Sequence, residues 1–285
     1  MKFIFTADWH IRPDTPRCRK DEDWLETQES QVDFVVSQVK KHDCSLIIGG
    51  DIFHKPQVPD FLKNMLMLSF VGQHVYAIAG NHDCPYHSWD NINDSSFGVL
   101  LRGGAVSEPE FAGFSHFGQK VGEIKEGIVF IHEPIFATAK DCPPSMKAKT
   151  ADQVFDEYPD AKWILCGDIH SGYHIKKQGR HLIMAGCLNR QASNFKDYEP
   201  KIWLIDTDAN TVEEILVPDD VSMITDEHIA EKSDREDRIA AFVTLIRDAK
   251  SVSLDFSNNV FQAISENGDL DPETINIIGE LMNEI

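Results

Sequence analysis

Short apolar runs recur along the chain, and each has the length of a strand rather than of a membrane-crossing helix. The runs are rich in Ile, Val and Phe, and they end at a glycine or a polar residue. This pattern is typical of strands that are buried inside a sheet. The runs lie at residues 2–7, 45–50, 75–80, 127–133, 162–167, 181–186 and 201–206.

Between the first three runs, the apolar positions change to helical spacing. In residues 24–41, one leucine and four valines fall on one face, and residues 60–73 repeat the pattern with Phe61, Leu62 and Met65. Alternating strands and helices predict an α/β layered fold at the start of the chain. The later runs lack long helices between them, so we expect a second, more mixed sheet there.

The pattern changes again near residue 218. Ser233, with an acidic residue three positions later, predicts the start of a helix. Asp271-Pro272 predicts the start of another. The apolar stripes of these helices suit either a partner protein or packing on their own core. We therefore expect a main domain at residues 1–218 and an acidic helical C-terminal appendage at residues 219–285.

The net charge of −20 is distributed unevenly. Residues 206–285 carry −15 of it, from 20 acidic and five basic residues, whereas the other 205 residues carry −5. A strongly acidic protein is a poor candidate for binding nucleic acid. Here the acidity belongs mostly to the C-terminal part, so it does not exclude a nucleic-acid substrate of the main domain.

The cysteines and the N-terminus indicate a cytoplasmic protein. The six cysteines are scattered without a CxxC pair, which predicts reduced thiols rather than a disulfide framework or a cysteine zinc site. The N-terminal apolar stretch is too short for the core of a signal peptide. No run is long enough to span a membrane, so we expect no membrane partner.

Acidic residues, histidines and an asparagine follow the predicted strands. They are Asp8 and His10, Asp51 and His54, Asn81, His82 and Asp83, His132, and Asp168 and His170. One such motif alone is more often a turn with an incidental histidine. Five in order, each at a strand exit, are hard to explain by turns and instead predict a metal site. Oxygen and imidazole ligands without thiolate suit Mn²⁺, Fe²⁺, Zn²⁺ or Mg²⁺.

This order of motifs resembles the calcineurin-like metallophosphoesterase superfamily over residues 1–217. Within it, TADWHIR at 6–12, GGDIFHKP at 49–56 and GNHD at 80–83 are most similar to SbcD-type nucleases of double-strand-break repair, including phage-encoded relatives. The resemblance implies a four-layer αββα sandwich, which agrees with the two sheets expected above. It also implies two divalent metal ions.

The resemblance assigns a role to each motif residue. Asp8, His10 and His170 hold one metal, Asn81, His132 and Asp168 hold the other, and Asp51 bridges the two with one carboxylate oxygen on each. His82 protonates the leaving oxygen or steadies its charge, and His54 assists from the other side. Two metals about 3.5–4 Å apart clamp a phosphate while a shared hydroxide attacks in line.

Asp168 departs from the family pattern, which has a histidine at this position. A further hard oxygen ligand favours Mn²⁺, with Mg²⁺ as the alternative, over Zn²⁺. Two arginines are candidate phosphate contacts. Arg12 either guides a phosphate backbone or belongs to a solvated loop, and Arg190 either contacts phosphate or forms a structural salt bridge.

The function implied is hydrolysis of DNA phosphodiester bonds, at ends or in single strands, as an exonuclease or endonuclease. The alternatives are a phosphoesterase acting on a nucleotide or another small phosphoester, and a catalytically silent scaffold of the same fold. The implied partners are a coiled-coil ATPase of SbcC type, bound through the C-terminal helices, and a second copy in a homodimer. The implied compartment is the cytoplasm of a bacterium or of a phage-infected host.

Overall fold

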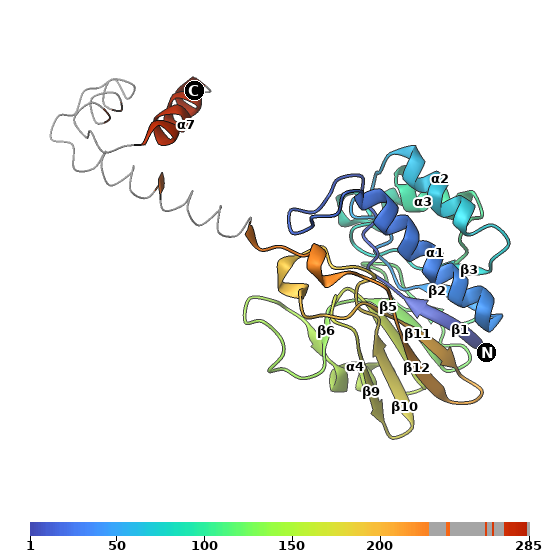
Figure 1. Ribbon diagram of the computed structural model, residues 1–285. Coiled ribbons are helices and arrows are strands. Elements are labelled where there is room, and N and C mark those ends of the chain that lie inside the picture. Colours follow the sequence, from blue (N-terminus) through green and yellow to red (C-terminus); the bar gives the residue numbers. More distant parts are fainter. Residues whose placement is uncertain (228–237, 240–259, 261–263, 265–270, 284–285) are drawn as a thin grey trace. The chain divides into compact units, whose positions relative to one another are not determined.

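The computed structural model describes residues 1–227, 238–239, 260, 264 and 271–283 (Figure 1). The chain divides into two compact units, Met1–Thr225 and Asp226–Ile285. The first unit contains two five-stranded sheets, with strand orders β12-β11-β1-β2-β3 and β4-β5-β8-β10-β9.

Each predicted apolar run forms a strand; all but β3, which lies at an edge, are inner strands of their sheets. The first sheet consists of β1 (Lys2–Thr6), β2 (Ser45–Ile48), β3 (Val75–Ala77), β11 (Lys201–Asp206) and β12 (Thr211–Leu216). The second consists of β4 (Gly113–Phe114), β5 (Ile128–His132), β8 (Trp163–Gly167), β9 (Tyr173–Lys177) and β10 (Arg180–Met184). Two short strands, β6 (Ile135–Phe136) and β7 (Lys149–Thr150), pair separately.

Helices cover the outer faces of both sheets (Figure 1). A core cluster joins Ile4 and Leu46 of the first sheet to residues of α1 (Trp24–His42), α2 (Asp60–Ser69) and α3 (Ser96–Arg102). A second cluster lies between the sheets and includes Phe3 and Phe130. A third joins the second sheet to α4 (Ala151–Glu157). The layers are therefore helix, sheet, sheet and helix, which confirms the expected αββα sandwich.

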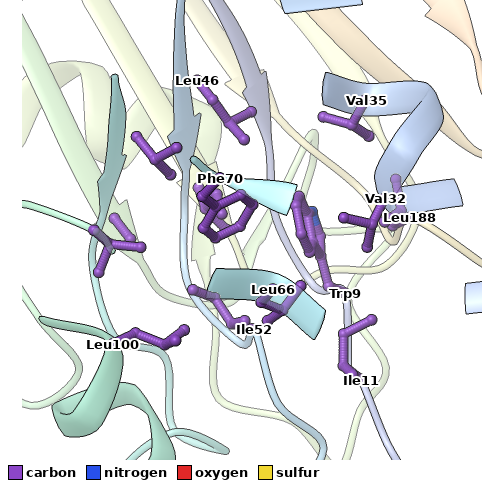
Figure 2. Close-up of a cluster of buried hydrophobic side chains, with 14 of the residues drawn as sticks. Trp9, Ile11, Val32, Val35, Leu46, Ile52, Leu66, Phe70, Leu100 and Leu188 are labelled. Atoms are coloured by element: carbon purple, nitrogen blue, oxygen red, sulfur yellow. The ribbon is translucent and has the colours of Figure 1, made fainter. Parts of the chain in front are cut away.

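The loop after β1 is anchored in the core beneath the first sheet. Trp9 is fully buried, its ring lies 6.1 Å from that of Phe70, and its indole N–H donates to Thr6 Oγ1 at 3.0 Å. Ile11 belongs to the same cluster, together with Leu66 of α2 (Figure 2). Asp8 and His10, which alternate with Trp9 and Ile11 along the chain, are thereby held at fixed positions.

One predicted boundary was wrong, because helix α2 ends at Ser69 rather than near residue 73, where the chain turns at Gly72 with a φ of +75°. Five of the described strands were not predicted: β4, β6, β7, β9 and β12. Strands β4, β6 and β7 have only two residues each. Strands β9 and β12 lie at the edges of their sheets, and much of β12 is exposed, so neither needs the continuous apolar run of a buried strand.

The second unit contains α7 (Pro272–Asn283), which begins where Asp271-Pro272 predicted a helix start. Asp271 Oδ1 accepts hydrogen bonds from the backbone N–H groups of Glu273 at 3.1 Å and Thr274 at 3.0 Å. The helix predicted from Ser233 lies outside the described residues. Among the described helices, none combines the length and apolar character that crossing a bilayer requires.

Candidate metal centre

The polar residues at the strand exits converge at one edge of the sandwich. Strands β1, β2 and β3 run parallel to one another, and so do β5 and β8, which brings their carboxyl ends together in each sheet. Donor atoms of Asp8, His10 and His170 lie within 4.8 Å of one another, as do those of Asp8, Asp51 and His132. The two groups share Asp8, so they form one continuous centre.

Asp51 lies between the two groups. Its Oδ2 atom is 3.7 Å from His10 Nε2 and 3.4 Å from His132 Nε2. Its Oδ1 atom accepts a hydrogen bond from the backbone N–H of His82 at 2.9 Å. The carboxylate therefore lies between the two groups, with Oδ2 facing a histidine of each group and Oδ1 oriented by the His82 N–H.

The remaining candidate ligands face the same space. His10 Nε2 is 3.0 Å from His170 Nε2, a contact between two nitrogens that a shared cation would stabilise. Asp168 Oδ1 is 3.7 Å from His132 Nε2, and the backbone N–H of Asp168 donates to both carboxylate oxygens of Asp8 at 3.1–3.2 Å. All of these residues were predicted from the strand exits.

Buried atoms without hydrogen-bond partners indicate that cations fit this centre. His132 Nε2 and Asn81 Oδ1 are buried and have no hydrogen-bond partner among the described residues, although His132 Nε2 faces the carboxylates of Asp51 and Asp168 at 3.4 and 3.7 Å. His132 Nδ1 lies 2.8 Å from the carbonyl oxygen of Gly49, to which its N–H donates, so in the neutral ring the Nε2 lone pair points into the centre. An unpartnered buried acceptor is costly, and a divalent cation would satisfy both atoms.

Electrostatics point the same way. Burial raises the pKa of Asp8 well above its usual range, and the neighbouring carboxylates of Asp51 and Asp168 raise it further against the opposing effect of His132. Burial lowers the pKa of His132, but the carboxylates of Asp51 and Asp8 raise it overall, well above its usual range. The cluster of carboxylates thus attracts positive charge.

The backbone at the centre adopts conformations that side chains disfavour. Asp8, His10, Asp51 and Asp168 have φ angles of 53°, 47°, 53° and 100°, and a left-handed conformation costs about 1–2 kcal/mol for each non-glycine residue. Backbone hydrogen bonds from Asp8 N to Gly50 O and from His10 N to Asp51 O, both 3.0 Å long, hold this geometry. Strain concentrated at converging polar groups is typical of a functional site.

His82 and His54 lie beside the centre. The ring centroid of His82 is 4.7 Å from that of His10 and 5.4 Å from that of His54. His82 Nδ1 lies 2.7 Å from the carbonyl oxygen of His54, so its N–H donates there and Nε2 is left available to a ligand. Burial, together with the guanidinium of Arg12, lowers the pKa of His54 to about 4.

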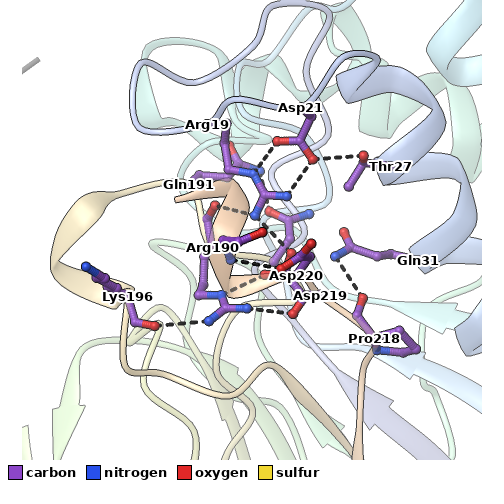
Figure 3. A network of polar contacts seen from close by, with 12 residues as sticks. Arg19, Asp21, Thr27, Gln31, Arg190, Gln191, Lys196, Pro218, Asp219 and Asp220 are labelled. Carbon is purple, nitrogen blue, oxygen red and sulfur yellow. Dashed lines mark hydrogen bonds and ion pairs between the residues drawn. The ribbon is translucent and has the colours of Figure 1, made fainter. Parts of the chain in front are cut away.

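Arg190 is not available to a phosphate in this structure (Figure 3). Its side chain is 5% exposed, and its Nε donates to Asp219 Oδ2 at 2.7 Å. Its two other nitrogens donate to the carbonyl oxygens of Lys196 and Asp219 at 3.0 and 2.8 Å. The proposed phosphate contact is therefore corrected to the structural salt bridge, which was the alternative.

Arg12 lies near His54, but it too has a partner. Its guanidinium forms an ion pair with Asp14, whose side chain is 59% exposed. Gln28 of α1 holds the backbone of Arg12, accepting from its N–H and donating to its carbonyl oxygen, both at 2.9 Å. Because Asp14 is exposed, this pair can open to an incoming anion, unlike the buried pair at Arg190.

Three further residues support the centre: Asp83, which was named from the sequence without an assigned role, and two residues that were not singled out there. Asp83 accepts hydrogen bonds from the backbone N–H groups of Gly80 and Phe53 at 3.0 and 3.1 Å, which ties the loop after β3 to the loop after β2. Gln191 Nε2 donates to the carbonyl oxygen of His10 at 3.0 Å. His116 Nδ1 accepts from Ala79 N at 2.9 Å. Only Asp83 lies in a recognised motif; no local signal marks the other two.

Comparison with known proteins places this geometry in a family. An archaeal phosphodiesterase structure is similar at 12% identity with a TM-score of 0.42, and a single-site variant of Vps29 from Entamoeba histolytica at 8% with 0.39. Each comparison covers 76% of this chain and 100% of the other, and the similarity is too low to bear on function. No curated protein matches the sequence. The family profile of calcineurin-like phosphoesterases matches residues 1–172, more than half of the chain, and the chain therefore belongs to that family.

Proposed function

We propose that this protein is a dinuclear-metal phosphodiesterase that hydrolyses DNA, at ends or in single strands. The observation that carries the metal-dependent chemistry is that two donor groups share Asp8 and that Asp51 Oδ2 lies between them, 3.7 Å from His10 Nε2 and 3.4 Å from His132 Nε2. His132 Nε2 and Asn81 Oδ1 face this space without a hydrogen-bond partner among the described residues. The choice of DNA rests on the motifs at residues 6–12, 49–56 and 80–83, which resemble SbcD-type nucleases.

In this proposal, Asp8, His10 and His170 hold one divalent ion, Asn81, His132 and Asp168 hold the other, and Asp51 bridges them. Bound ions supply Lewis acidity and an activated water for attack on phosphorus. We propose Mn²⁺ as the metal, with Mg²⁺ as the alternative, because three of the seven side chains are carboxylates.

The protein's own side chains position the substrate and move the proton. His82 acts as the imidazolium: Nε2 gives its proton to the leaving oxygen, and the ring becomes neutral and keeps the Nδ1 proton, which donates to the His54 carbonyl and fixes the ring. His54 stays neutral above pH 4 or so, because its pKa is lowered to about 4, so it acts as a hydrogen-bonding group beside the phosphate. The guanidinium of Arg12 leaves Asp14 and binds a phosphate of the DNA strand instead.

The experiment is cleavage of end-labelled single-stranded and double-stranded oligonucleotides in Mn²⁺, with the Asp51→Ala variant as the control. We expect cleavage by the wild type and none by the variant. Cleavage of bis-p-nitrophenyl phosphate without cleavage of DNA would instead assign a small phosphoester as substrate. Absence of both activities and of bound metal would make the protein a silent scaffold.

We further propose that the second unit binds a coiled-coil ATPase. Two isoleucines of α7, Ile275 and Ile277, are 41% and 37% exposed, whereas Ile278 is buried. An amphipathic helix with additional exposed apolar residues suits docking in a groove. Co-purification with such an ATPase, lost when both exposed isoleucines are changed to serine, is the result that supports this partner. We also propose that two copies of this chain form a homodimer, which sedimentation would test.

A further inference from the structure

A short loop with an aromatic residue lies against the metal centre. The ring of Phe195, at the end of the 3-10 helix Ser193–Phe195, has its centroid 5.4 Å from that of His170, at an angle of 45°. The ring is partly exposed. A partly exposed aromatic ring beside a candidate metal ligand is a surface on which part of a substrate can stack.

The loop is held in place from behind. Arg190 donates to the carbonyl oxygen of Lys196 at 3.0 Å and is itself fixed by the buried carboxylate of Asp219. On the other side, the ring of Phe195 packs edge-on against Tyr198, with 6.3 Å between centroids. These contacts fix the loop before substrate arrives, so the position of the ring is built into the fold.

Lys196, the residue after Phe195, adds a positive charge to the same loop. Its side chain is exposed and turns away from the Arg190 network (Figure 3), and no described residue forms an ion pair with its ammonium group. Other lysines of the same unit, such as Lys149 and Lys201, do pair with carboxylates. In a chain with a net charge of −20, an exposed lysine that has no acidic partner among the described residues and follows Phe195 in the chain is available to an anion.

We propose that Phe195 and Lys196 form a nucleotide subsite on the His170 side of the centre. The ring stacks on the base of a nucleotide adjacent to the cleaved bond, and the ammonium group contacts a neighbouring phosphate. This inference rests on the proposed hydrolysis of DNA and narrows it. Stacking needs a base whose face is free, so the preferred substrate is a single strand or a frayed end.

The ring is tested with Phe195→Leu on two Mn²⁺-dependent substrates: a normal single-stranded oligonucleotide, and the same oligonucleotide without the base next to the cleaved bond. Loss of a stacking contact raises KM for the normal strand about tenfold or more. The abasic strand has no base to stack, so its KM should change little between wild type and variant. Equal losses on both strands would mean that Phe195 only orients His170, and would overturn the proposal.

The charge is tested with Lys196→Gln, and Lys176→Gln is the matched control. Lys176 is an exposed residue of β9, opposite His181 of β10 in the strand register. It lies at the end of these strands that is away from the centre. Binding of a labelled single strand is measured at several salt concentrations with Ca²⁺ in place of Mn²⁺. Lys196→Gln should reduce the slope of log affinity against log salt by about 0.7, the value for one phosphate contact on a single strand, and the control should not. An unchanged slope would overturn the role of Lys196.

The same binding measurement separates this inference from the proposed function. If the wild type binds single strands but cuts none, hydrolysis of DNA is wrong, and the loss of binding in Phe195→Leu still decides whether the subsite exists. If the wild type neither binds nor cuts DNA, both proposals are overturned.

Discussion

Asp219 is the residue at which the structure makes its sharpest prediction about stability. Its carboxylate is fully buried between two arginines, with Oδ1 at 2.9 Å from Arg19 Nη1 and Oδ2 at 2.7 Å from Arg190 Nε. The side chains of Arg19 and Arg190 are 1% and 5% exposed. The change to test is Asp219→Ala, which removes the carboxylate and leaves both arginines in place.

The size of the destabilisation follows from the hydrogen-bond partners that each arginine keeps in the variant. Arg19 retains Asp21, whose two oxygens accept from its Nε and Nη2 at 2.6 and 2.7 Å. Arg190 retains only carbonyl oxygens, so its charge is left buried without a counter-ion. Removing one partner of a buried ion pair costs about 3–5 kcal/mol. For a unit of this size, that corresponds to a fall in Tm of about 6–20 °C.

Thermal unfolding followed by circular dichroism measures the effect, and Asp220→Ala is the matched control. Asp220 is the next residue, and its carboxylate is exposed and caps only the turn at Ser222. We expect a large fall in Tm for Asp219→Ala and little change for the control. If the two variants unfolded within a degree or two of each other, Asp219 would not stabilise the loops around the centre as argued.

Three further predictions concern the centre itself. In Gly80→Ala, the new Cβ would collide with Asp51 Oδ1 and lie 2.6 Å from Asp51 N. Titration calorimetry should show that the affinity for Mn²⁺ falls by more than about a hundredfold, which is more than the loss of an outer hydrogen bond causes. The control Gly122→Ala, whose Cβ would lie in open space, should bind Mn²⁺ normally. In His82→Asn, kcat should fall by about 10²–10⁴-fold, the contribution of one proton donor, with Mn²⁺ affinity kept; loss of the metal as well would assign His82 to structure rather than to proton transfer. In Arg12→Gln, loss of a nearby positive charge should raise the pKa of His54 from about 4, while burial still holds this pKa below its usual value. An NMR titration of the metal-free protein measures the change, and an unchanged pKa would refute the influence of Arg12.

The sequence determined the sandwich and the candidate ligands because both depend on local patterns. A strand buried on both faces must be apolar throughout, so β1, β2, β5 and β8 were visible as runs. Polar groups that follow such strands gather at the edge where the parallel strands end. The order of Asp8, Asp51 and Asp168 along the chain therefore predicted that they meet.

The tertiary structure alone decided how these groups are used. Arg190 could have faced a phosphate, and only the fold shows that it pairs with Asp219, 29 residues later. Likewise, only the fold shows that Asp51 Oδ1 accepts a hydrogen bond from the His82 N–H and that Oδ2 lies between His10 and His132. The physical reason is that partners distant in sequence are chosen by packing, and packing depends on the whole chain rather than on the residues next to each motif.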